Sequence, residues 1–160
     1  MQAERAQLQR PGGLALLALL CAAIRVARAA FPATLSATAH LRAGPCIAYP
    51  VVTNVGFGTA LTVSGCGQGY GWCDVQLGGY RGWMAAQYLQ VPGPQGPVII
   101  ASAGPVMALP LVTFSFNTYW DGYYRTYPWY MRRGYYYGYW NRYPHGRPPP
   151  PRPPPPPQPR

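Results

Sequence analysis

The sequence predicts an all-β protein with one compact unit at residues 34–91, followed by a largely irregular tail rich in Pro, Tyr and Arg. Short runs of apolar and β-branched residues, separated by turn residues, predict strands, and none of these runs has a helical period. Gly78-Gly79 lies between two alternating runs, as in a two-residue β-hairpin, because such turns need positive φ. The Pro and Gly residues at 91–97 then mark the end of the compact unit.

The expected strands are short and closely spaced. Turn residues separate them, as is usual in β-proteins. Several short strands joined by Gly turns within about 58 residues predict a small barrel or sandwich. We expect the strands at residues 36–41, 51–55, 61–63, 72–77 and 80–84.

Residues 1–29 have the pattern of an export signal peptide. Arg5 and Arg10 form a basic start, residues 14–24 are apolar, and Ala27-Arg28-Ala29 offers a small-x-small cleavage pattern. The apolar run is too short to span a bilayer comfortably, since a membrane helix needs ~20 residues. We therefore expect cleavage, no transmembrane helix in the mature chain, and a periplasmic or secreted location. An uncleaved N-terminal anchor is the alternative.

Three further segments follow the compact unit. We expect residues 92–118 to be a linker and an apolar extended segment, because Pro105 and Pro110 favour a segment lying against the barrel over a membrane span. Residues 119–147 form a Tyr/Trp/Arg-rich tail, which either folds back over the barrel or stays solvated. Residues 148–160 contain ten prolines and predict a polyproline II rod.

The charge balance is strongly basic. The chain has 13 Arg, no Lys and three acids (Glu4, Asp74 and Asp121), which gives a net charge of +10. A chain of this charge favours anionic surfaces. The shortage of acids excludes a glycosidase of the usual type, which needs two carboxylates across the scissile bond, since residues 34–91 contain Asp74 alone. We expect no enzyme activity.

Four stretches carry a family resemblance: Leu41-Arg42-Ala43-Gly44-Pro45, Tyr49-Pro50-Val51-Val52, Trp72-Cys73-Asp74-Val75 and Gly82-Trp83-Met84-Ala85-Ala86-Gln87-Tyr88-Leu89. Over residues 37–90 the chain resembles the bacterial SH3 domain family. The resemblance implies a small SH3-like half-open barrel of five to seven short strands. It also implies a place in the cell envelope, where such domains are often fused to cell-wall hydrolases and are proposed to bind peptidoglycan or peptides.

Three cysteines remain after signal cleavage, so one disulfide and one leftover thiol are expected in an oxidising compartment. Cys66 and Cys73 flank the loop 67–72 at facing strand positions, which lie within disulfide reach, and we predict a bond between them. Cys46 is then interpreted as a buried or incidental thiol, since no His is placed to activate it; an intermolecular disulfide is the alternative. A zinc site that adds His40 lacks the paired Cys spacing, so no metal and no cofactor are expected.

The aromatic residues of the compact unit divide into core and surface. Trp72 and Trp83 lie on facing strands, and we expect both to be buried. Tyr49, Tyr70 and Tyr80 lie in or beside loops and turns. They are the candidate ligand-binding residues, because their rings would be free to stack on a sugar or a peptide.

Together these patterns favour a non-catalytic exported envelope protein whose barrel binds cell-wall peptidoglycan, an envelope peptide or an envelope protein. In the alternative, the protein is structural or adhesive: its basic aromatic tail binds anionic envelope polymers, and the barrel is a stable scaffold. Arg and aromatic residues also mix in nucleic-acid-binding segments. An exported chain meets envelope polymers first, so nucleic acid is not the expected partner.

Overall fold

The computed structural model describes residues 30–143. The predicted signal peptide at 1–29 and the predicted polyproline rod at 148–160 lie outside the described residues, and so do residues 144–147 of the predicted tail.

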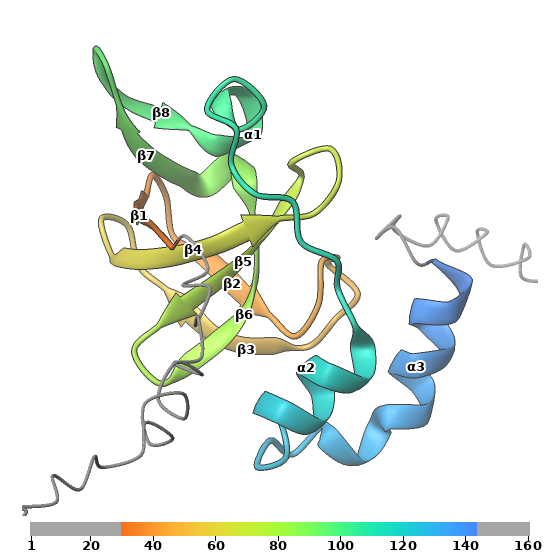
Figure 1. Ribbon diagram of the computed structural model, residues 1–160. Coiled ribbons are helices and arrows are strands. Elements are labelled where there is room, and N and C mark those ends of the chain that lie inside the picture. Colours follow the sequence, from red (N-terminus) through yellow and green to blue (C-terminus); the bar gives the residue numbers. More distant parts are fainter. Residues whose placement is uncertain (1–29, 144–160) are drawn as a thin grey trace, which may run out of the picture.

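The described part of the chain contains eight short strands in one curved antiparallel sheet that does not close (Figure 1). The strand order is β3-β2-β6-β5-β4-β1-β7-β8. The architecture is the all-β, SH3-like arrangement that the sequence predicts. The strands are β1 (Phe31–Leu35), β2 (Ala39–Arg42), β3 (Val51–Val55), β4 (Ala60–Cys66), β5 (Trp72–Leu77), β6 (Tyr80–Ala85), β7 (Leu89–Gly93) and β8 (Gly96–Ile99), with a 3-10 turn η1 (Ala86–Tyr88) before β7.

The predicted hairpin at Gly78-Gly79 is confirmed. It joins β5 to β6, with Leu77 opposite Tyr80 in the first pair. Gly78 has a φ of 54°, a conformation that a residue with a side chain rarely adopts. The turn sets the register of the two strands and so places Asp74 opposite Trp83, and both of these side chains are buried.

The sheet has more strands than the five to seven that the resemblance implies. Strands β7 and β8 form a hairpin. We expected the barrel to end at residue 91 and the linker to begin at residue 92, so this hairpin extends the sheet into the predicted linker. Pro92 and Pro97 lie opposite each other in this hairpin. Strand β8 is at the edge of the sheet, where Pro97 needs no N–H group for an outer neighbour. Strand β7 pairs with β1 only at Leu89 and Gln90, so Pro92 lies beyond that pairing and does not interrupt it.

The barrel core follows the two-residue period of the strands. In β4, for example, Leu61 and Val63 are buried while Thr62 between them is only partly covered, because successive side chains point to opposite faces of the sheet. The core residues include Leu35, Leu41, Val55, Leu61, Val63, Val75, Met84 and Leu89.

The prediction of a largely irregular tail is wrong for most of its described residues. Helices α2 (Phe116–Tyr123) and α3 (Arg133–Arg142), joined through the short 3-10 helix η2 (Tyr130–Arg132), lie against one side of the barrel (Figure 1). We call residues 116–143 the aromatic cap. The cap folds because its rings bury apolar surface against the barrel. A second core results, with Phe116, Tyr119, Trp120, Tyr124 and Tyr136 of the cap around Ala43, Cys46, Tyr49 and Trp83 of the barrel.

The apolar segment before the cap lies against the barrel, the arrangement that the sequence favoured over a membrane span. It begins with the single-turn helix α1 (Ile100–Ala103). Further on it extends the end of β4: the N–H of Cys66 donates to the carbonyl of Pro110 (2.9 Å), and the N–H of Val112 donates to the carbonyl of Cys66 (2.8 Å). Within residues 30–143, no helix is long and apolar enough to cross a membrane.

Candidate functional site

A groove of about 300 Å³ opens beside the loop between β4 and β5. Its lining comes from that loop, from the two tryptophans of β5 and β6, and from the segment that leads to the aromatic cap. The barrel and its C-terminal extension therefore form the groove together. We call it the Trp72 groove; it is lined by Pro45, Gly67, Gln68, Gly69, Gly71, Trp72, Trp83, Val112, Thr113 and Phe114.

The loop at the Trp72 groove is held at its base and carries few side chains. A disulfide joins Cys66 and Cys73, which confirms the predicted pair. Gly69 and Tyr70 have φ values of 82° and 53°, so the chain reverses through a left-handed conformation that favours glycine. A Cβ atom added at Gly69 or Gly71 would meet nothing within 4 Å. An approaching ligand can therefore come close to the backbone at Gly69 and Gly71, although the carbonyls of Gly67 and Gly71 already accept hydrogen bonds from Tyr70 and Ala86.

The two tryptophans of the groove differ in exposure. Trp83 is fully buried, as expected, and its indole N–H has no hydrogen-bond partner among the described residues. Trp72 was expected in the core too, but it is only half-buried and lines the groove. Phe114 packs edge-on against Trp83 with the ring centroids 5.7 Å apart. Aromatic surface next to open backbone is suited to hold a peptide or a sugar ring.

A second hollow of about 380 Å³ lies between β1, β4 and the β7–β8 hairpin. Its lining residues are aliphatic residues, Pro and Gly, except for two polar residues, Thr34 and Gln90. It offers neither an aromatic ring nor a charge to orient a ligand, so the Trp72 groove is the better candidate.

Tyr49 does not lie on the surface, contrary to expectation. Its side chain is 2% exposed because rings of the C-terminal segment cover it. Tyr136 stacks on it with centroids 6.3 Å apart, and Phe114 and Tyr139 each approach edge-on at 5.5 Å. Burial raises the pKa of the Tyr49 phenol well above its ordinary value, and Tyr139 and Cys46 raise it further. Its ring is not available to stack on a ligand.

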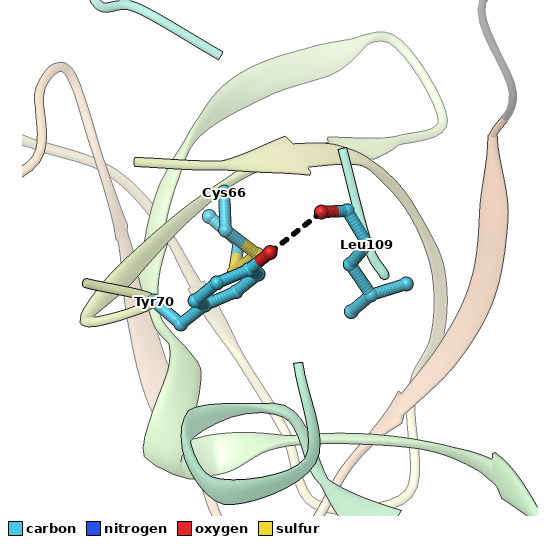
Figure 2. Close-up of a disulfide and its surroundings, with 4 residues drawn as sticks. Cys66, Tyr70 and Leu109 are labelled. Atoms are coloured by element: carbon cyan, nitrogen blue, oxygen red, sulfur yellow. Dashed lines mark hydrogen bonds between the residues drawn. A yellow bond between two sulfur atoms is a disulfide. The ribbon is translucent and has the colours of Figure 1, made fainter. Parts of the chain in front are cut away.

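Tyr70 and Tyr80 do not join the groove either. The hydroxyl of Tyr70 donates to the carbonyl of Leu109 at 2.8 Å, directly beside the Cys66 disulfide (Figure 2). This contact ties the segment after α1 to the loop between β4 and β5. Tyr80, at the β5–β6 turn, is 47% exposed. The structure therefore does not bring the three predicted tyrosines together, and ligand binding by Tyr70 or Tyr80 stays a prediction.

The single acid of the barrel is buried beneath the cap. Asp74 is 1% exposed and forms a two-point ion pair with Arg81. The Arg81 guanidinium lies over the rings of Tyr119 and Tyr123, 5.9 and 5.3 Å from their centroids. Burial would lower the pKa of Arg81, but its hydrogen bond and ion pair with Asp74 raise it above the ordinary value. Burial, with the nearby Asp74 charge, raises the pKa of Tyr119. The cluster attaches α2 to the barrel.

Cys46 is the free cysteine of the described residues, and it is buried. Its Sγ lies 3.0 Å from the hydroxyl of Tyr139 in α3, and burial followed by the Cys46 contact raises the pKa of Tyr139. Cys66 and Cys73 have no thiolate to offer a metal, because they are joined. Residues 30–143 contain no group of three or more His, Cys, Asp or Glu that could hold a metal ion.

An open antiparallel barrel with a disulfide-bonded loop beside an aromatic groove defines a small SH3-like β-barrel domain. Residues 37–90 match the family model of the bacterial SH3 domain. This part of the chain belongs to the bacterial SH3 domain family, as the sequence predicts, and such domains are commonly cell-wall binding modules. The match includes strands β2 to β6 and stops before the aromatic cap. Neither curated proteins nor solved structures gave a match.

The groove residues differ from those that the sequence singled out. Sequence reasoning selected tyrosines beside loops, whereas the groove uses Trp72 and the glycines of the loop. Gly67, Gly69 and Gly71 at alternate positions before Trp72 were a usable signal, since they leave backbone exposed beside a ring. Phe114 carried no such signal, because it comes from a segment far along the chain.

Proposed function

We propose that this chain is a non-catalytic exported envelope protein whose barrel binds cell-wall peptidoglycan, or a peptide of the envelope, in the Trp72 groove. The observation that carries the proposal is the groove itself. It combines a partly exposed indole with a loop of bare backbone in a bacterial SH3 domain.

The chemistry of the groove suits a peptide or glycan strand. Extended peptides and acetylated sugars both present amide groups, which the backbone groups of Gly69 can pair with. The Gly71 carbonyl, which already accepts from the Ala86 N–H, has a second lone pair to offer. Their apolar faces can lie on the indole of Trp72. A volume of about 300 Å³ is at the small end for a ligand site, so we expect it to hold one or two units of a polymer.

Two further observations support the location and the absence of catalysis. The Cys66–Cys73 disulfide persists in oxidising compartments, which agrees with a periplasmic or secreted protein. Both aspartates among residues 30–143 are engaged, Asp74 by Arg81 and Asp121 by Arg133. Neither is placed as a free acid or base for hydrolysis.

Co-sedimentation of the full chain with isolated cell-wall sacculi tests the proposal. Trp72→Ala should lower the retained fraction about tenfold, because a central Trp is often a dominant contact in a binding site. Phe57→Ala is the control: it removes a ring that is 75% exposed and outside the groove, and retention should not change. Tyr80→Ala tests the other predicted contact at the β5–β6 turn. All three variants are first checked for folding by circular dichroism.

Two results would contradict the proposal. Full retention of Trp72→Ala would rule out the groove as the contact, and loss of binding in Tyr80→Ala would then place it at the β5–β6 turn. Release of soluble wall fragments by the protein over time would show a catalyst instead of a binding protein.

A further inference from the structure

The positive charges of the described residues are not balanced by acids. Residues 30–143 hold six arginines and two aspartates. Asp74 is already paired with Arg81, and Asp121 with Arg133. The remaining four guanidinium groups therefore have no carboxylate partner in this part of the chain, and three of them lie in the aromatic cap: Arg125, Arg132 and Arg142.

Arg132 and Arg142 lie near the two ends of α3. Arg132 precedes the helix, with its guanidinium over the ring of Tyr135, 5.4 Å from the centroid. Tyr135 is 64% exposed, and Arg142 is exposed on the last turn. Residues seven apart in a helix lie on nearly the same face and are ~10 Å apart along its axis. Tyr135 and Arg142 therefore share one solvent-facing side of α3.

Between these side chains the helix backbone is not covered by other side chains. Gly134 and Gly138 lie on the exposed part of α3, and a Cβ added at either position would meet nothing within 4 Å. Packing against the barrel therefore does not explain the missing side chains. A polymer crossing the helix can approach its backbone closely there, with Arg132 and Arg142 on either side.

The other two arginines of the cap, Arg125 and Arg133, both hydrogen-bond to Asp121, so the cap retains a net positive charge. Arg133 binds the Asp121 carboxylate, and Tyr130 donates to the same oxygen at 3.0 Å. The Nε of Arg125 donates to the backbone carbonyl of Asp121 at 2.8 Å. One carboxylate thus faces two guanidinium groups, so the whole cap, with four Arg against one Asp, carries a net charge of +3.

We propose that the exposed face of α3, formed by Arg132, Tyr135 and Arg142, binds a phosphate-bearing polysaccharide of the envelope. Guanidinium groups match the oxygens of phosphate with paired hydrogen bonds. The Tyr135 ring offers a flat face for a sugar. The disulfide of the barrel agrees with an oxidising compartment outside the cytoplasm, where such polymers are the anionic partners at hand. This site is separate from the Trp72 groove and acts independently of it.

Binding of the full chain to purified wall teichoic acid, measured by isothermal titration calorimetry at low and high salt, tests the site. The double variant Arg132→Gln and Arg142→Gln should weaken binding about fivefold at low salt, and Tyr135→Ala should weaken it at both salt concentrations. The matched control is Gln87→Glu with Gln95→Glu, which lowers the net charge equally on exposed barrel positions. The control should keep most of the affinity.

The outcomes separate this site from general charge attraction. Equal losses in the control and in the arginine variant would overturn the proposal, since net charge alone would then explain binding. Tighter binding to duplex DNA than to teichoic acid, or unchanged binding of Tyr135→Ala, would also overturn it. Trp72→Ala should bind teichoic acid as tightly as the native chain does. Failure of the proposed function at the Trp72 groove is therefore distinguishable from failure of the proposed site on α3.

Discussion

Arg81 on β6 holds the buried carboxylate of Asp74 on β5 with two hydrogen bonds, 3.1 Å from Nε and 2.5 Å from Nη2. The two residues belong to the bacterial SH3 domain, yet the rings that cover the pair, Tyr119 and Tyr123, belong to the aromatic cap. The hydroxyl of Tyr124 also donates to the Arg81 backbone carbonyl at 3.2 Å. The Arg81–Asp74 ion pair is therefore a point of contact between the bacterial SH3 domain and the aromatic cap.

Arg81→Met should destabilise the protein by about 3 kcal/mol, because it leaves the Asp74 charge buried without a partner. The free energy of unfolding from urea titration measures the effect. The double variant Arg81→Met with Asp74→Asn should recover a large part of the loss, since it removes the orphaned charge as well. If the double variant is less stable by the sum of the two single effects, the pair does not act as a unit.

Phe114→Ala should loosen the cap and expose Cys46. The Phe114 ring contacts Tyr49, Trp83 and Tyr119, with centroids 5.3 to 5.7 Å apart, and removing a buried Phe costs about 3 kcal/mol. Iodoacetamide labelling of Cys46, followed by peptide mapping, should be slow in the native protein and faster in the variant. Val106→Ala, at a site that is 88% exposed, is the control and should leave labelling slow.

Removal of the disulfide should weaken the barrel. On the chain-entropy model, a ring of about eight residues contributes about 2.5 kcal/mol, so Cys66→Ala with Cys73→Ala should unfold at a lower temperature. Reductant should lower the melting temperature of the native protein by a similar amount and leave that of the double variant unchanged. A native melting temperature that does not respond to reductant would contradict the contribution assigned to this bond.

Asp121 should titrate below its ordinary pKa of 3.8, because its hydrogen bond with Arg133 favours the carboxylate, with Tyr130 also lowering the pKa. Because the pKa is lower in the folded state, the charged carboxylate stabilises the cap at every pH above the ordinary pKa of Asp121. This stabilisation is lost as the pH falls through the folded-state pKa. Carbon-13 NMR titration of the side chain should show the shift, and Arg133→Gln should return the pKa toward 3.8. An unchanged pKa in Arg133→Gln would contradict this cause.

The barrel was largely predictable because its signals are local. The turn between β5 and β6 needs glycine at Gly78, where φ is positive, whatever surrounds it. Alternating apolar residues mark strands such as β4 before any partner is known. The Cys66–Cys73 pair followed from the same strand positions. Strands β1, β7 and β8 were missed. For β8 the reason is that Pro97 is typical of a linker unless it is known that the strand lies at an edge.

The binding site was less predictable because its exposure depends on residues far apart in the chain. Tyr49 and Trp72 both lie close to loops. The cap covers Tyr49, while the Trp72 groove stays open between the loop and residues 112–114. Nothing near either residue in the sequence distinguishes these outcomes.

The sequence by itself determined the bacterial SH3 domain, its central hairpin and its disulfide, since these depend on turn chemistry and strand period. Only the tertiary structure decided that the aromatic tail folds into a cap. The residues of α3 are mostly Tyr and Gly, which are weaker helix formers than Ala or Leu, so the helix is stabilised by burial against the barrel. Packing of α2 on the barrel also shelters the Arg81–Asp74 pair under Tyr119 and Tyr123, and packing of α3 through Tyr136 leaves Arg132, Tyr135 and Arg142 exposed to solvent.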